Sequence, residues 1–68
     1  MKTIALAPNR NKQEAIELAA EMAEWLAERQ VRVVSVPEVA KAAQTPVDAR
    51  TDEELVSADL LVVLGGDG

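Results

Sequence analysis

Three glycines and one carboxylate close the sequence: Gly65, Gly66, Asp67 and Gly68 follow the apolar run Leu60–Leu64. A short run of branched apolar residues bounded by glycine is typical of a strand buried on both faces of a parallel sheet. Ligands of open α/β sheets bind at the carboxyl ends of the strands, so the carboxylate is placed for binding or for chemistry. We refer to residues 65–68 as the glycine motif.

The glycine motif has the residue types of a phosphate site. Glycine lets a ligand approach the main chain, whose N–H groups can then donate to phosphate oxygens. A carboxylate would repel phosphate unless it had another task, such as accepting a hydroxyl proton or holding a magnesium ion. Spacing alone leaves a second interpretation open, in which the glycines form a tight turn without a ligand.

A second set of candidate residues lies in the turn after the first apolar run, where the sequence is PNRNK from Pro8 to Lys12. Arg10 and Lys12 precede a predicted helix, and cations near a helix N-terminus oppose the helix dipole. This unfavourable placement indicates contact with an anion. The alternative is that both residues are solvated charges of an exposed turn.

Apolar strands alternate with helical segments along the chain, which predicts an α/β fold of the order β-α-β-(α)-α-β. We expect strands at Lys2–Ala7, Val31–Val36 and Leu60–Leu64. We expect a long helix from about Asn11 to Glu28 or Arg29, short helices at residues 37–43 and 52–57, and a loop at residues 44–50. Two pairs have the spacing of capping boxes at helix starts: Asn11 with Glu14, and Thr51 with Glu54.

The long helix has an apolar side and an acidic side at the 3.6-residue period. The predicted core stripe consists of Ala15, Ile16, Ala19, Met22, Ala23 and Leu26, and the acidic side of Glu14, Glu17, Glu21, Glu24 and Glu28. A row of carboxylates along a rod does not converge on a cation, so we expect no metal site there. Leu18 and Trp25 lie at the edge of the acidic side. We expect them to contact another subunit or a missing part of the protein, with packing against a local loop as the alternative.

Length and charge limit the classes of function. With 68 residues the chain is at most one small domain, and we expect it to be part of a larger protein. Seven Lys and Arg against twelve Asp and Glu leave a net charge of -5, which provides no basic surface for nucleic acid or an anionic membrane. The sequence has no cysteine and no apolar stretch near the roughly 18 residues of a membrane span, so we expect a cytoplasmic protein.

The combination of three segments resembles the amino-terminal region of NAD kinases. These are LGGDG at Leu64–Gly68, the preceding TDEELVSADLLVV, and IALAPNRNK before a long amphipathic helix. The GGDG tetrad also occurs in diacylglycerol and sphingosine kinases and in 6-phosphofructokinases, so alone it indicates only their broader superfamily. Lipid kinases of that group usually have asparagine before proline and a glycine close behind, whereas here Pro8 precedes Asn9 and no glycine follows, which favours NAD kinase.

The resemblance implies a Rossmann-like three-layer parallel sheet, of which residues 1–68 form the amino-terminal part. The family's following helix and β-rich second domain lie beyond this sequence. The resemblance makes Asp67 the general base beside the ribose 2′-hydroxyl, and it places Gly65, Gly66 and Gly68 along the nucleotide and phosphate site. Asn9 corresponds to a family asparagine in the turn after the first strand, and Arg10 and Lys12 accompany it as candidate anion ligands. Gln30 departs from the family, which commonly has glycine at this helix end, where the backbone is left-handed.

The implied activity is phosphorylation of the 2′-hydroxyl of NAD by ATP or polyphosphate, with Mg²⁺, to give NADP. We expect the 68 residues alone to be inactive and the parent protein to be a homo-oligomer. The rival interpretations are a lipid kinase of the diacylglycerol kinase type, a sugar kinase like 6-phosphofructokinase, and a non-catalytic α/β fragment that only binds. Donor preference and NAD versus NADH cannot be decided from these residues.

Overall fold

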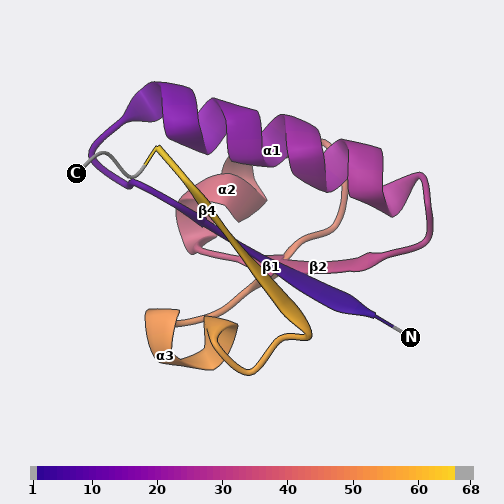
Figure 1. The fold of residues 1–68 in the computed structure, drawn as a ribbon. Coiled ribbons are helices and arrows are strands. Elements are labelled where there is room, and N and C mark those ends of the chain that lie inside the picture. The colour runs from indigo at the N-terminus through magenta and orange to yellow at the C-terminus, as the bar shows by residue number, and fades with distance from the viewer. Residues whose placement is uncertain (1, 66–68) are drawn as a thin grey trace.

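The structure is a computed structural model that describes residues 2–65, so Gly66, Asp67 and Gly68 lie outside the described residues. Four parallel strands form one sheet in the order β3-β2-β1-β4. The elements are β1 (Thr3–Pro8), α1 (Gln13–Ala27), β2 (Arg32–Ser35), α2 (Pro37–Ala42), β3 (Asp48–Ala49), α3 (Asp52–Leu55) and β4 (Leu60–Leu64). Helices α1 and α2 lie over one face of the sheet and α3 over the other (Figure 1). The predicted three-layer α/β arrangement is confirmed.

The expected loop at residues 44–50 is partly wrong, because it contains a strand. Asp48 and Ala49 form β3, which pairs with Val34 and Ser35 of β2. The Arg50 N–H extends this pairing by donating to the Ser35 carbonyl over 2.8 Å. Thr45 precedes Pro46, and a residue before proline favours extended backbone, which is compatible with an edge strand. Only the neighbouring β2 supplies the hydrogen bonds that define a strand.

The predicted capping box of Asn11 and Glu14 is also wrong. The N-cap of α1 is Lys12, and no side chain caps this helix. The Asn11 N–H instead donates to Oδ1 of Asn9 over 3.0 Å, which is the hydrogen bond of an Asx turn. The helix therefore begins at Gln13 and not at Asn11. The second box is confirmed: Thr51 Oγ1 accepts from the Glu54 N–H, and Glu54 Oε1 accepts from the Thr51 N–H.

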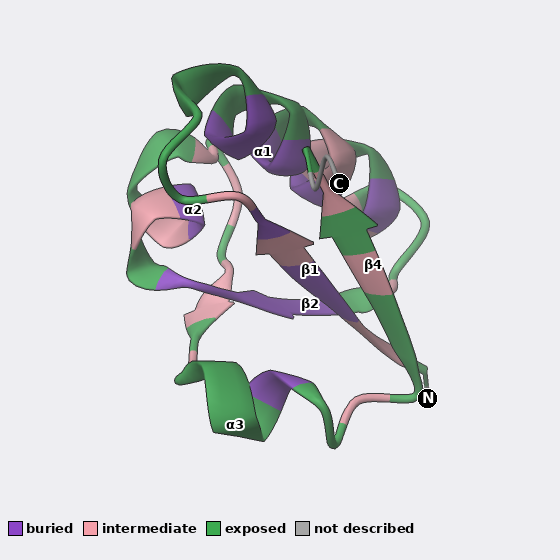
Figure 2. Cartoon of the chain, turned by 60° about the vertical axis from the view of Figure 1, so that its left-hand side comes forward, coloured by how far each residue is buried: buried purple, intermediate pink, exposed green. Residues whose placement is uncertain are grey.

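The core lies between α1 and the sheet, and the predicted stripe of α1 faces it. Five of its six residues are buried, Met22 is half-buried, and Ala20 is buried as well. Alanine brings the helix close to the strands, where Leu6 is fully buried (Figure 2). Ser35 is the one buried polar residue among those described, and its hydroxyl donates to the Leu6 carbonyl over 2.6 Å.

Strand β4 is not buried on both faces, contrary to the expectation. It pairs only with β1 and forms an edge of the sheet as described. Val62 and Leu64 pack against the core, whereas Leu61 is 40% and Val63 66% exposed. Successive strand residues point to opposite faces, and α3 lies beside β1 without covering the second face of β4 (Figure 2). An apolar strand sequence therefore did not distinguish a central position from an edge position.

Leu18 and Trp25 are 48% and 54% exposed, as expected for residues outside the core stripe. The Arg29 guanidinium lies 3.5 Å from the centroid of the Trp25 ring, a cation–π contact within the same helical end. Nη1 of Arg29 also donates to the Trp25 carbonyl over 3.0 Å. A contact of Leu18 and Trp25 with another subunit remains a prediction.

Helix α1 ends in a left-handed turn at Gln30, whose φ is 61°. The Val31 N–H donates to the Leu26 carbonyl over 3.1 Å and the Gln30 N–H to the Ala27 carbonyl over 3.0 Å. These are the two hydrogen bonds of a Schellman motif, in which the left-handed position is usually glycine. The left-handed turn is therefore formed at this helix end although the residue there is a glutamine, which has a Cβ atom.

Replacing Gln30 by glycine is expected to increase the free energy of unfolding by about 0.5–1 kcal/mol. A left-handed backbone costs a residue with a Cβ atom roughly 1–2 kcal/mol, and the greater freedom of glycine in the unfolded chain offsets part of this gain. Urea denaturation of the two proteins measures the difference. Gln30→Ala is the control, because it removes the polar side chain and keeps the Cβ atom. Equal stabilisation by both substitutions would contradict the assignment to backbone conformation.

Candidate functional site

The carboxyl ends of β1 and β4 meet next to the first turn of α1 (Figure 2). Pro8 pairs with Leu64 at the end of the ladder, and the Asn9 N–H continues it by donating to the Leu64 carbonyl over 2.8 Å. Asn9 and Gly65, which are 56 positions apart, therefore lie side by side. The turn PNRNK and the entry to the glycine motif are parts of one site, at the sheet edge where α/β proteins bind ligands.

Asn9 connects two backbone segments of this site, the turn before α1 and the residue after β4. Its Nδ2 donates to the Gly65 carbonyl over 3.3 Å, and its Oδ1 accepts from the Asn11 N–H over 3.0 Å. Its own carbonyl accepts from the Lys12 N–H over 3.0 Å, just before α1 begins. Asn9 is half-buried. The sequence resemblance implied that Asn9 binds the cofactor, which stays a prediction, and it did not predict these contacts with the backbone.

Gly65 occupies a position that only glycine fits. Its φ is 70°, in the left-handed region, and a Cβ atom built on it would lie 2.7 Å from Cβ of Ala15. Such a distance requires movement of Ala15, which sits in the buried first turn of α1. The neighbour that requires glycine at position 65 is therefore a helix of the same chain, and the predicted contact of Gly65 with a phosphate stays a prediction. The predicted site residues Gly66, Asp67 and Gly68 lie outside the described residues.

Arg10 is paired with a carboxylate of the chain itself. Its Nη2 lies 2.9 Å from Oε2 of Glu38 and its Nε donates to the same oxygen over 3.0 Å. The hydrogen bond from Arg10 is the largest cause that lowers the pKa of the Glu38 carboxyl from its ordinary value. The ion pair therefore contributes above the ordinary pKa of glutamate and is lost as the pH falls through the lowered pKa. Contact of Arg10 with a ligand anion remains a prediction.

The remaining predicted cation, Lys12, is the exposed N-cap of α1, and its carbonyl accepts from the Ala15 N–H over 3.1 Å. A further cation, Arg50, follows β3 and was not singled out in the sequence. Arg10, Arg50 and Thr51 line a pocket of about 450 Å³. Arg50 could not be found from sequence, because its segment was expected to be a loop and its position beside Arg10 depends on the pairing of β3.

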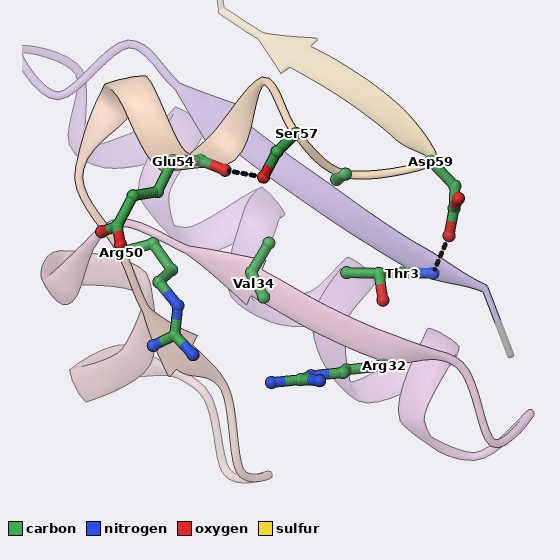
Figure 3. A pocket seen from close by; sticks show the side chains of 8 residues that line it. Thr3, Arg32, Val34, Arg50, Glu54, Ser57 and Asp59 are labelled. Carbon is green, nitrogen blue, oxygen red and sulfur yellow. Dashed lines mark hydrogen bonds between the residues drawn. The ribbon is translucent and has the colours of Figure 1, made fainter.

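A second pocket, of about 280 Å³, lies near the amino ends of β1 and β2 on the side of α3 (Figure 3). Several of its polar groups are paired with other groups of the chain. Oδ2 of Asp59 accepts from the Thr3 N–H over 2.8 Å, and Nη2 of Arg32 lies 2.7 Å from Oδ2 of Asp48. The hydrogen bond from Arg32 is the largest cause that lowers the pKa of the Asp48 carboxyl. This pocket is a structural junction at the end of the sheet opposite to the glycine motif.

Residues 2–65 contain no group of three or more His, Cys, Asp or Glu placed to hold a metal ion. None of the helices described is long and apolar enough to cross a membrane.

Two curated proteins match the chain over its whole length. The NAD kinase of Heliobacterium modesticaldum is 39% identical over 69 residues, and the NAD kinase of Geotalea daltonii is 37% identical over 68 residues. The chain spans 24% of the length of each relative. No family model matches the chain, and no solved structure matches it. The comparison confirms the resemblance to NAD kinases that the glycine motif and its flanking segments indicate.

Proposed function

We propose that the complete gene product, meaning the whole polypeptide encoded with this segment, is an NAD kinase. The similarity of the entire chain to two NAD kinases is the observation that carries the proposal. The chain spans 24% of the length of each relative. We therefore propose that it contributes one wall of the nucleotide site and is inactive alone. The meeting of Asn9 and Gly65 at the carboxyl edge of the sheet supports a ligand site at this place.

In the proposed reaction the 2′-oxygen of the NAD adenosine ribose attacks the γ-phosphorus of ATP. A bond forms between this oxygen and phosphorus, the bond to the β–γ bridging oxygen breaks, and ADP leaves. Asp67 accepts the hydroxyl proton as general base. The backbone of Gly65, Gly66 and Gly68 lines the nucleotide and phosphates. Arg10 and Lys12 lie in the turn beside this motif and are the candidate cations of the segment.

Magnesium is proposed to enter with the nucleotide. The carboxylates described between residues 2 and 65 form no metal site, and they do not fit a resident ion. The proposed phosphate donor is ATP or polyphosphate, and the cytoplasmic location expected from the sequence remains a prediction.

The proposal is tested by incubating the complete gene product with NAD and ATP and measuring NADP with an NADP-dependent dehydrogenase. Diacylglycerol and fructose 6-phosphate are offered separately as acceptors, because the rival kinases share the GGDG tetrad. We expect NADP to form and neither rival acceptor to be phosphorylated at a comparable rate. Phosphorylation of a rival acceptor without NADP formation would overturn the assignment. Absence of any transfer would favour a binding fragment.

A further inference from the structure

The most connected side chain at the candidate site is Asn9, and all its contacts are made with backbone. The Oδ1 contact with the Asn11 N–H and the Nδ2 contact with the Gly65 carbonyl require opposite ends of one amide group. An asparagine supplies an acceptor and a donor on one short stem, and only one orientation of the amide satisfies both partners here. Asn9 therefore acts as a bridge between the turn before α1 and the residue that follows β4.

The bridge controls where the chain enters the glycine motif. Gly65 is held by the Asn9 side chain on its carbonyl and by Ala15 against its Cα, where no Cβ atom fits. The residue before it is held by the Asn9 N–H, which bonds the Leu64 carbonyl. Asn9 thus donates hydrogen bonds to the carbonyls of two successive residues, Leu64 at the end of β4 and Gly65 after it.

We infer that Asn9 is a positioning residue for the glycine motif and does not act by contacting the nucleotide. The inference rests on the proposed function for its kinetic consequence, because the motif carries the residue proposed as general base. A group that orients a catalytic segment lowers kcat when it is lost, whereas a group that binds substrate uniformly raises KM. The proposed role therefore has a kinetic signature different from that of the nucleotide ligand that the sequence resemblance implies for Asn9.

Asn9→Asp in the complete gene product isolates the bridge. The aspartate keeps an acceptor for the Asn11 N–H but has no N–H for the Gly65 carbonyl, and its second oxygen would face that carbonyl oxygen. Gln44→Glu is the control, because it makes the same change from amide to carboxylate at an exposed residue outside the candidate site. The first measurement is steady-state kinetics with NAD and ATP. The second is hydrogen exchange of peptides that cover residues 60–68.

We expect Asn9→Asp to lower kcat by about 3- to 10-fold, with either KM changing by less than about 3-fold, because one hydrogen bond is lost. Exchange of residues 60–68 should become faster by a similar factor, and Gln44→Glu should behave like the parent in both measurements. A raised KM with unchanged kcat, unchanged exchange, or an equal effect of Gln44→Glu would overturn the inference. Failure of the unsubstituted protein to form NADP would contradict the proposed function instead, and the exchange measurement would still decide whether Asn9 holds Gly65.

Discussion

Asp67→Asn in the complete gene product is expected to lower kcat for NAD phosphorylation by about 10²- to 10⁴-fold, the usual contribution of a positioned general base. Asparagine keeps the size of the side chain and much of its hydrogen-bonding shape, but it cannot accept the hydroxyl proton. The KM for ATP should change only a few-fold, because the lost interaction belongs to the transition state. Steady-state kinetics of both proteins measures the two parameters.

The control and the competing role of Asp67 are tested in the same series. Glu21→Gln makes the same change from carboxylate to amide on the exposed side of α1 and should leave kcat near that of the parent. If Asp67 coordinates magnesium, a high magnesium concentration should restore much of the activity of Asp67→Asn. A kcat close to that of the parent at every magnesium concentration would remove Asp67 from catalysis and leave the glycine motif as a tight turn.

Gly65→Ala is expected to lower the free energy of unfolding of the complete gene product by about 2–5 kcal/mol. Two costs add: a left-handed backbone with a Cβ atom costs roughly 1–2 kcal/mol, and overpacking against a buried residue costs typically 1–3 kcal/mol. Both follow from the φ of 70° at Gly65 and the 2.7 Å approach to Ala15. Urea denaturation monitored by circular dichroism measures the loss.

A second substitution separates these two costs. Ala15→Gly removes the atom that the new Cβ would meet, so the double variant should recover about 1–3 kcal/mol relative to the sum of the single variants. Ala23→Gly is the matched control, because it makes the same change at a buried position of α1 that has no contact with Gly65. Recovery of equal size with Ala23→Gly, or additive effects of Gly65→Ala and Ala15→Gly, would contradict the steric explanation.

The local features of this protein were predictable because local interactions produce them. The apolar stripe of α1 follows from the 3.6-residue period, and the capping box of Thr51 and Glu54 needs only partners three residues apart. Gln30 departs from the glycine that the family commonly has at this helix end, and the structure nevertheless forms a left-handed turn there with φ 61°. The resemblance carried by the glycine motif also came from sequence, and the two NAD kinases confirm it.

The wrong predictions concern contacts between distant segments. The capping box expected at Asn11 does not form, because the Asn11 N–H donates to the Asn9 side chain. Asn9 in turn forms hydrogen bonds with the carbonyls of Leu64 and Gly65, from the other end of the chain. Strand β3 forms because its backbone pairs with that of β2. It consists of two residues, Asp48 and Ala49, which are too few to show an alternation of apolar and polar side chains in the sequence.

The sequence by itself determined the order of the helices and of the three longer strands, the core face of α1 and the glycines that follow an apolar strand. Only the tertiary structure decided that β4 lies beside β1, which brings Gly65 to Asn9 and Ala15 across 50 residues of chain or more. The physical reason is that hydrophobic periodicity and helix capping depend on residues that are close to one another along the chain. Strand order and register depend on which distant faces pack together, and the candidate site is made by that packing.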